Sequence, residues 1–178
     1  MKLKTTYRRH RGALGINVVA FILTLAAVLG HGGPAIAANG PPDFTLILPG
    51  GLACSFDLQI EGWDGKQHIK EFTGKNGVVR TLSAGTGSAL HYTNLETGAT
   101  FSSKSNGAVT QTTYNPDGSS TLKLTGHNLV ILFPTDFPPG PSTTLYAGHV
   151  VILIDTSGNW TVQEESGKMT DICGILSH

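Results

Sequence analysis

Apolar and polar side chains alternate with a period of two along most of the chain after residue 53. In the segment 54–61, Phe56, Leu58 and Ile60 share one side, and the residues between them are polar. This is the period of a β-strand, whose successive side chains point to opposite faces, and not the period of a helix. The same alternation returns in segments 68–72, 78–82, 88–93, 100–103, 109–114, 120–125, 129–133, 143–154, 160–164 and 170–175. We therefore expect an all-β domain without a helix.

Short turn signals separate these segments. Glycine, asparagine and proline, which favour turns, gather at 74–77, 94–98, 106–107, 115–118 and 156–159. The glycine-rich stretch 83–88 is interpreted as a longer turn between two strands. Short strands joined by short turns predict an antiparallel meander of about ten strands. Because nearly every connection has hairpin length, an up-and-down β-barrel is favoured over a two-sheet sandwich.

Two segments, 129–133 and 150–154, are apolar on both faces and are expected to be central, covered strands. The loop 134–142 that joins them holds four prolines in nine residues, which makes it stiff and unable to pair as a strand. Phe137, Pro138 and Pro139 lie at its middle. The loop is either a lid over one end of the core or a displayed recognition loop.

The first 37 residues have the pattern of a secretory signal peptide. Lysine and arginine precede an apolar run at 13–29, and Ala35-Ile36-Ala37 suits cleavage after Ala37. An uncleaved N-terminal anchor is the alternative, because the run is close to membrane-spanning length. The pattern favours a secreted protein with no stable membrane insertion after cleavage. It predicts three parts: the signal 1–37, a flexible lead 38–52 and a single all-β domain 53–178.

Removing the signal changes the charge of the chain. Five of the twelve lysines and arginines leave with it and all twelve acidic residues stay, so the net charge becomes 7 − 12 = −5. An acidic domain of this kind is unsuited to nucleic acid. Cys54 and Cys173 reach an oxidising compartment, where a disulfide is expected, and we predict that it joins the first and last strands.

His127 and His149 form the one candidate ligand or metal pair. If the hairpin around the proline loop pairs residues whose numbers sum to 276, the two imidazoles lie opposite each other. Two histidines do not make a metal site, and the only candidates for a third ligand are His91 or an aspartate. Two partly exposed histidines at strand ends are the ordinary alternative, and we expect no metal and no cofactor. The sequence also lacks the motifs of serine hydrolases, zinc proteases and phosphate-binding loops.

Three stretches, 126–136, 140–146 and 166–173, together with Cys54-Ser55-Phe56, resemble a group of small exported proteins of actinomycete bacteria. The resemblance spans most of the domain. It implies a bacterial, exported origin. The group has no assigned activity, so the resemblance assigns no catalytic or binding residue.

Three functions remain open. The leading one is an extracellular binding module without enzyme activity, expected as a monomer, that holds a small ligand in a barrel mouth or a partner on the proline loop. The second is a structural or cell-surface protein. The third is a barrel hydrolase or isomerase that uses His127, His149 or Glu61. The expected interior residues are Phe56, Leu58, Ile60, Leu90, Leu122, Leu124, Leu129, Ile131, Leu145, Val151 and Leu153.

Overall fold

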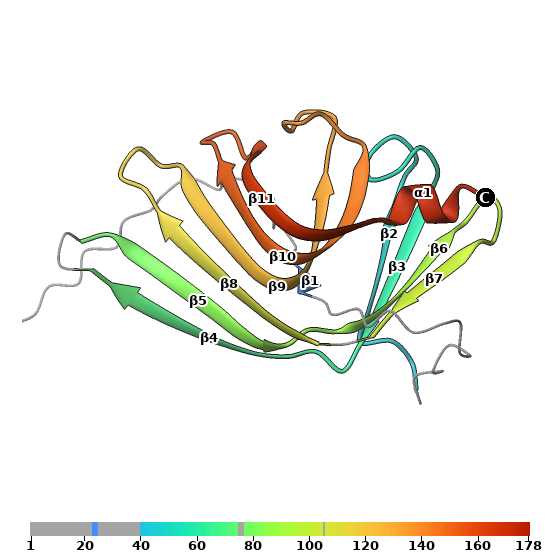
Figure 1. Cartoon of the computed structure of the whole chain (residues 1–178), viewed down its shortest axis with the longest axis horizontal. Helices are drawn as coiled ribbons and strands as arrows, with labels where there is room; N and C mark the ends of the chain where they lie inside the picture. The colour runs from blue at the N-terminus through green and yellow to red at the C-terminus, as the bar shows by residue number, and fades with distance from the viewer. Residues whose placement is uncertain (1–22, 25–39, 75–76, 105) are drawn as a thin grey trace, which may run out of the picture.

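The computed structural model describes residues 23–24, 40–74, 77–104 and 106–178, and in them it has two antiparallel sheets (Figure 1). The larger sheet has the order β11-β10-β9-β8-β5-β4, with β1 paired beside β9. Its strands are β1 (Leu23–Thr24), β4 (Lys66–Thr73), β5 (Val79–Thr86), β8 (Gly107–Tyr114), β9 (Ser120–Leu132), β10 (Ser142–Ile154) and β11 (Trp160–Asp171). The smaller sheet has the order β2-β3-β6-β7, with β2 (Phe44–Leu48), β3 (Leu58–Trp63), β6 (Ala89–Asn94) and β7 (Thr100–Ser103). The all-β prediction is confirmed.

Three long strands run through both sheets and kink between them. β3 leads into β4, β5 into β6 and β7 into β8, each across two or three residues. Because β3 pairs with β6 and β4 pairs with β5, one long hairpin contributes to both sheets. When each kinked pair is counted as one long strand, consecutive strands pair antiparallel, as in a meander. The stretch 83–88 is not the long turn that the sequence suggested, since β5 continues to Thr86.

A row of small residues marks the line along which the larger sheet bends. Gly85, Ala108, Gly126, Gly148 and Gly167 are successive cross-strand partners on β5, β8, β9, β10 and β11. A Cβ atom on Gly126, whose φ is +89°, would lie 2.6 Å from the carbonyl oxygen of Gly107. A Cβ atom on Gly148 would collide with the carbonyl oxygen of Ser166. The backbones therefore approach closely here, and β9, β10 and β11 curve upward like a trough (Figure 1).

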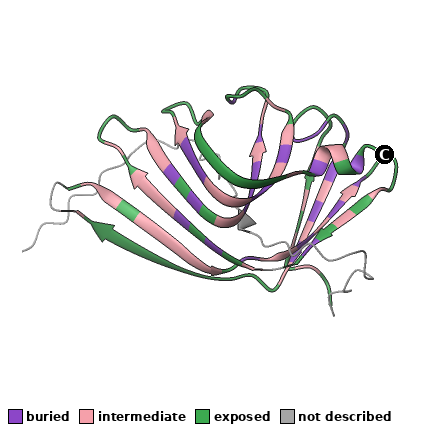
Figure 2. Cartoon of the chain, viewed as in Figure 1, coloured by how far each residue is buried: buried purple, intermediate pink, exposed green. Residues whose placement is uncertain are grey.

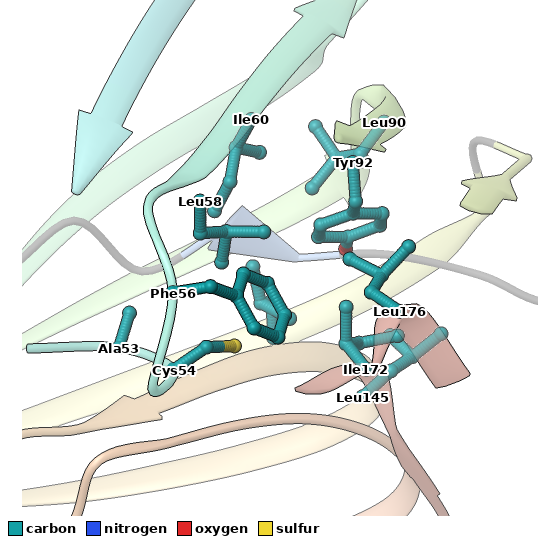
Figure 3. Close-up of a cluster of buried hydrophobic side chains, with 11 residues drawn as sticks. Ala53, Cys54, Phe56, Leu58, Ile60, Leu90, Tyr92, Leu145, Ile172 and Leu176 are labelled. Atoms are coloured by element: carbon teal, nitrogen blue, oxygen red, sulfur yellow. The ribbon is translucent and has the colours of Figure 1, made fainter. Parts of the chain in front are cut away.

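Two buried clusters lie on opposite faces of the β9–β10 hairpin. The first, which we call the trough cluster, fills the inside of the bend; its buried members are Leu122, Leu124, Val130, Leu132, Tyr146, Val150 and Ile152. The second, the interlayer cluster, lies between the smaller sheet, the other face of the hairpin and the C-terminal helix (Figure 3). Its larger members include Phe56, Leu58, Ile60, Leu90, Tyr92, Leu129, Leu145, Ile172 and Leu176. The purple bands of Figure 2 follow these two clusters.

The proline-rich loop is fastened to the start of β11. The carboxylate of Asp136, which is buried, accepts hydrogen bonds from the backbone N–H of Phe133 at 2.6 Å and of Trp160 at 2.8 Å. The backbone of Phe137 also pairs with that of Trp160 and Val162. The loop backbone thus joins the end of the hairpin to β11, while the Phe137 side chain is 64% exposed.

The structure corrects two expectations about the chain ends. Strand β2 lies inside the lead 38–52, which we expected to be flexible throughout, because Phe44, Leu46 and Leu48 alternate and pack against the interlayer cluster. A short helix, α1 (Ile172–Leu176), follows β11 where the sequence predicted strand. The side chain of Asp171 caps it by accepting from the backbone N–H of Gly174.

The disulfide between Cys54 and Cys173 is present, with the two Cα atoms 5.5 Å apart. We predicted that it joins the first and last strands, and this is wrong. Cys54 lies in the connection between β2 and β3, and Cys173 lies in α1. Alternation alone did not show that the segment 170–175 turns into a helix after Asp171, with Ile172 and Leu176 on its buried side.

The predicted interior is largely confirmed. Nine of the eleven expected residues are buried, and Ile131 and Leu153 are only partly buried. Ile131 packs against the interlayer cluster from its margin. The described part of the chain contains no helix that is long and apolar enough to cross a membrane. The predicted signal segment 1–37 lies outside the described residues, apart from β1.

Candidate functional site

Strand β9 leaves its neighbour β8 at the bend, and part of its edge is not paired with β8. β8 pairs with β9 from Ser120 as far as Gly126, whereas β10 stays paired along all of β9. On the β8 side, the stretch 127–132 is paired by one other described strand, β1, through Leu23 with Leu129 and Thr24 with Asn128. We call this place the fork and define it as residues 127–132 of β9 with Ala108 and Thr110 of β8.

The fork contains two buried polar side chains without partners. Asn128 is 1% exposed, and neither its side-chain oxygen nor its nitrogen has a hydrogen bond. Thr110 is 6% exposed, and its hydroxyl is also without a partner. Buried polar groups are nearly always hydrogen-bonded, and each group left unpaired costs about 1–3 kcal/mol. Two such residues at the same fork indicate a place where a partner is missing.

Both residues belong to the face that lines the trough. Thr110 is the cross-strand partner of Leu124, which is a member of the trough cluster. Asn128 is opposite Tyr146, another member of that cluster. Because residues two apart on a strand share a face, the Asn128 amide and the Thr110 hydroxyl lie on the same side of the sheet, on either side of the bend.

Beyond Thr110 the same face becomes polar and open. One cross-strand row runs from Thr110 to Ser83 and on to Ile69 at the edge strand β4. The hydroxyl of Ser83 donates to the side-chain oxygen of Gln67 at 2.6 Å, and Ile69 is 75% exposed. Every residue of β4 is exposed, as the green strand in Figure 2 shows. The face beyond Thr110 therefore carries a hydroxyl and an amide group and is exposed at β4.

Tyr146 supplies a further polar group next to the fork. Its hydroxyl donates to a carboxylate oxygen of Glu165 at 2.9 Å. Burial, followed by the hydrogen bond and the charge of Glu165, raises the pKa of the Tyr146 phenol above its ordinary value. Tyr146 therefore stays a neutral donor at physiological pH and does not act as a base.

The expected pairing of His127 with His149 is wrong. Partners in the hairpin sum to 274, so His127 lies opposite Ala147 and His149 opposite Thr125. The register differs because Phe133 does not pair with Thr143; its N–H bonds to the Asp136 carboxylate, and its carbonyl accepts from Asp136 and Gly140. No group of three histidine, cysteine or acidic residues that could hold a metal occurs among the described residues.

A row of chemically active side chains that the sequence did not reveal crosses the smaller sheet. His91 lies between Glu61 on β3 and Ser102 on β7 as a cross-strand partner of both. The Nδ1 atom of His91 and the Ser102 hydroxyl are 2.8 Å apart. Among the described residues, no hydrogen bond joins His91 to the Glu61 carboxylate. A serine nucleophile requires a histidine that a carboxylate orients, and this row lacks that contact.

Comparison with known proteins returns no relative: no family model, no curated protein and no solved structure matches this chain. The resemblance to exported actinomycete proteins therefore stays a prediction. The candidate site is defined by its own geometry, in which the fork combines an incomplete strand edge with unpaired buried polar groups.

Proposed function

We propose that this protein is an exported binding module without enzyme activity, and that its ligand sits at the fork. The observation that supports this is the Asn128 side chain, which is buried with both of its polar atoms unpaired. An amide offers two donors and an acceptor, so one ligand group that both accepts and donates would satisfy it. A buried amide without hydrogen bonds destabilises the fold, and a ligand that hydrogen-bonds to it removes that cost.

The groups around the fork support binding in preference to catalysis. Asn128 and Thr110 have neutral side chains that do not ionise near pH 7. Tyr146 is held as a neutral donor by burial and by Glu165. Such groups orient a ligand, but they do not form the pair of a nucleophile and a base that hydrolysis requires.

The proposal includes secretion after cleavage at Ala37 and an up-and-down barrel as the parent architecture. Supporting secretion, the Cys54–Cys173 bond suits an oxidising compartment. Supporting the barrel, the kinked strands follow one another as in a meander, although the described strands form two open sheets. The described members of both buried clusters lie after residue 43, so the chain 38–178 contains all of these members.

A thermal-shift panel tests the proposal. The chain exported by a bacterial host is heated with short peptides, fatty acids and oligosaccharides, each at a large excess. A ligand at about a hundred times its Kd adds about 2.7 kcal/mol, which raises the Tm of a domain of this size by about 5 °C or more.

The shift is expected to vanish in Asn128→Leu and Thr110→Val. It should persist in Thr113→Val, a control on the opposite face of β8. If no probe raises the Tm, or if a stabilising probe acts equally on Asn128→Leu, the fork is not the ligand site and the proposal is wrong.

A further inference from the structure

We infer that the ligand of the fork is an extended peptide, which pairs antiparallel with β9 along residues 127–132; this inference rests on the proposed function. It is a case of strand addition, in which backbone hydrogen bonds hold the peptide and alternate side chains select it. Three observations lead to it: the open edge of β9, the strand that already lies there, and the Asn128 amide.

The first observation is that the open edge belongs to buried backbone. Asn128, Leu129, Val130 and Leu132 are all buried. More than nine in ten buried backbone N–H and C=O groups are hydrogen-bonded in folded proteins. Among the described strands, only the two-residue β1 pairs with this edge. Six residues of strand span about 20 Å, so there is room for a peptide that is longer than β1.

The second observation is the identity of the strand at the fork. β1 is antiparallel to β9 and also approaches β8, so it occupies the opening between them. Its residues, Leu23 and Thr24, belong to the segment that we predict to be removed on export. In the precursor, β1 therefore pairs with this edge of β9. Cleavage removes β1 and leaves the edge free to pair with a peptide from another molecule.

The third observation sets the side chains that the peptide should carry. A residue opposite Asn128 faces the trough side, and Thr24 of β1 is the backbone partner at that position, as Leu23 is of Leu129. With threonine there, the Asn128 amide still has no hydrogen-bond partner. A matching peptide is therefore apolar, with the longer amide side chain of asparagine or glutamine opposite Asn128. A charged residue at this buried position would be strongly unfavourable.

A small polar molecule is the less favoured ligand. It would satisfy the Asn128 amide, but it would not pair with the backbone of Val130 and Leu132, which has no partner on the β8 side among the described strands. A strand with an amide opposite Asn128 pairs with that side chain and with the backbone together. The peptide explanation accounts for both features of the fork.

The probe is a labelled peptide, Lys-Lys-Phe-Ile-Leu-Asn-Leu-Ala-Lys-Lys, which carries residues 21–26 of this chain between lysines for solubility, with asparagine in place of Thr24. Its binding to the exported chain is followed by fluorescence anisotropy. We expect a Kd in the micromolar range and no comparable binding of a scrambled peptide. Asn128→Leu should weaken binding about tenfold, the effect of about 1.4 kcal/mol, and Thr113→Val should not change it.

Two N-methylated versions of the probe test strand pairing directly. Along a strand, successive backbone N–H groups point alternately to its two edges. Methylation of alternate amides in one frame should abolish binding, because it removes the hydrogen bonds to β9, whereas the other frame should bind within about threefold of the parent. Equal binding in both frames would show nonspecific apolar contact and overturn the inference.

A second substitution, of the central asparagine of the probe with valine, tests the contact with Asn128. The valine probe should bind the wild-type chain about tenfold more weakly, and Asn128→Leu should weaken its binding no further. If no peptide binds while a non-peptide probe in the thermal-shift panel depends on Asn128, the peptide inference fails and the proposed function stands. If no probe of any class acts through Asn128, both fail.

Discussion

At the scale of the residue, Asn128 is the position where stability and function are expected to oppose each other. Its amide is buried in the face that otherwise holds Leu124 and Val130, and it has no partner. A residue that serves only the fold would be more stable there as an apolar side chain of similar size. The pairing of stability and binding measurements on one variant therefore separates a structural from a binding role.

We predict that Asn128→Leu raises the free energy of unfolding of the exported chain by about 1–3 kcal/mol, because it removes an unpaired buried amide. Urea unfolding at pH 7 measures this, and an unchanged m-value would show that only stability has altered. Thr113→Val, on the other face of β8, should stay within about 0.5 kcal/mol. A destabilised Asn128→Leu would mean that the amide already has a partner in the free protein.

The burial of a single residue could be predicted where the pattern of its own strand determines it. Alternation identified Leu58, Leu124 and Leu145 as interior, because a half-buried strand needs nothing beyond its own pattern. Asn128 could not be identified in this way. Its burial depends on where β9 bends and leaves β8, which is a relation between strands and not a property of the local pattern.

At the scale of the element, the bend in β9 and β10 depends on the close approach of three backbones. Gly148 lies between Gly126 and Gly167, and a Cβ atom on it would lie 2.9 Å from the Cα atom of Gly167. The neighbouring atoms are backbone and cannot rotate away. The bend encloses the trough cluster and separates β9 from β8 at the fork. Gly148 therefore contributes to both features.

Gly148→Ala is expected to reduce the free energy of unfolding by at least about 2 kcal/mol, since the added methyl group forces β10 and β11 apart. Gly107→Ala is the matched control: it lies beside the same row, and a Cβ atom added to Gly107 would have no other atom within 4 Å. The control should change stability by no more than about 0.5 kcal/mol. Comparable losses in the two variants would exclude the close approach as the cause.

The turn between β10 and β11 carries a contribution to stability that depends on pH. The Asp155 carboxylate accepts hydrogen bonds from the Asn159 side chain and from the backbone N–H groups of Asn159 and Ser157. The bonds from Asn159, side chain first and then backbone, lower the pKa of Asp155. A carboxyl group with a lower pKa in the folded state stabilises the fold above its unfolded pKa of about 4, and this contribution is lost as the pH falls through the folded value.

Asp155→Ala should therefore lower the Tm by a constant amount between about pH 5 and 7, and the difference from the wild type should shrink from about pH 4 downward. Thermal melts followed by circular dichroism between about pH 7 and pH 2 measure it. Thr156→Ala, a neighbour that does not titrate, should show a difference that does not vary with pH. A constant difference for Asp155→Ala would show that the carboxylate charge is not involved.

Strands were predicted correctly where the local sequence pattern determines them. The prediction was wrong where tertiary packing determines the element. The strand segments 100–103 and 143–154 agree with β7 and β10 to within a residue. The segments 120–125 and 129–133 merged into β9, because Gly126 bends the strand without ending it. Helix α1 escaped prediction, since five residues are too few to show a period of 3.6 and its stability comes from burying Ile172 and Leu176.

At the scale of the whole molecule, the order of strands was predictable, whereas the places where the chain passes from one sheet to the other were not. Hairpin-length turns imply antiparallel neighbours, and the long kinked strands keep that order. The kinks after β3, β5 and β7 lie at short polar connections that resemble ordinary turns in the sequence. The fork lies where β9 continues beyond its pairing with Gly107–Tyr114 of β8, while β7, which precedes β8, belongs to the smaller sheet.

The disulfide acts at this largest scale, because it links residues 119 positions apart, near the start of the smaller sheet and after the end of the larger one. In the chain-entropy description a loop of this length restricts the unfolded chain by roughly 5 kcal/mol. We predict that the double variant Cys54→Ala, Cys173→Ala loses about 3–5 kcal/mol in guanidinium unfolding, and that a reductant lowers the wild-type midpoint towards that of the variant. The reductant should leave the variant unchanged. A loss below about 1 kcal/mol would mean that the unfolded chain is already held compact without the bond, and the interlayer cluster around Ile172 and Leu176 would then be what fixes α1 to the smaller sheet.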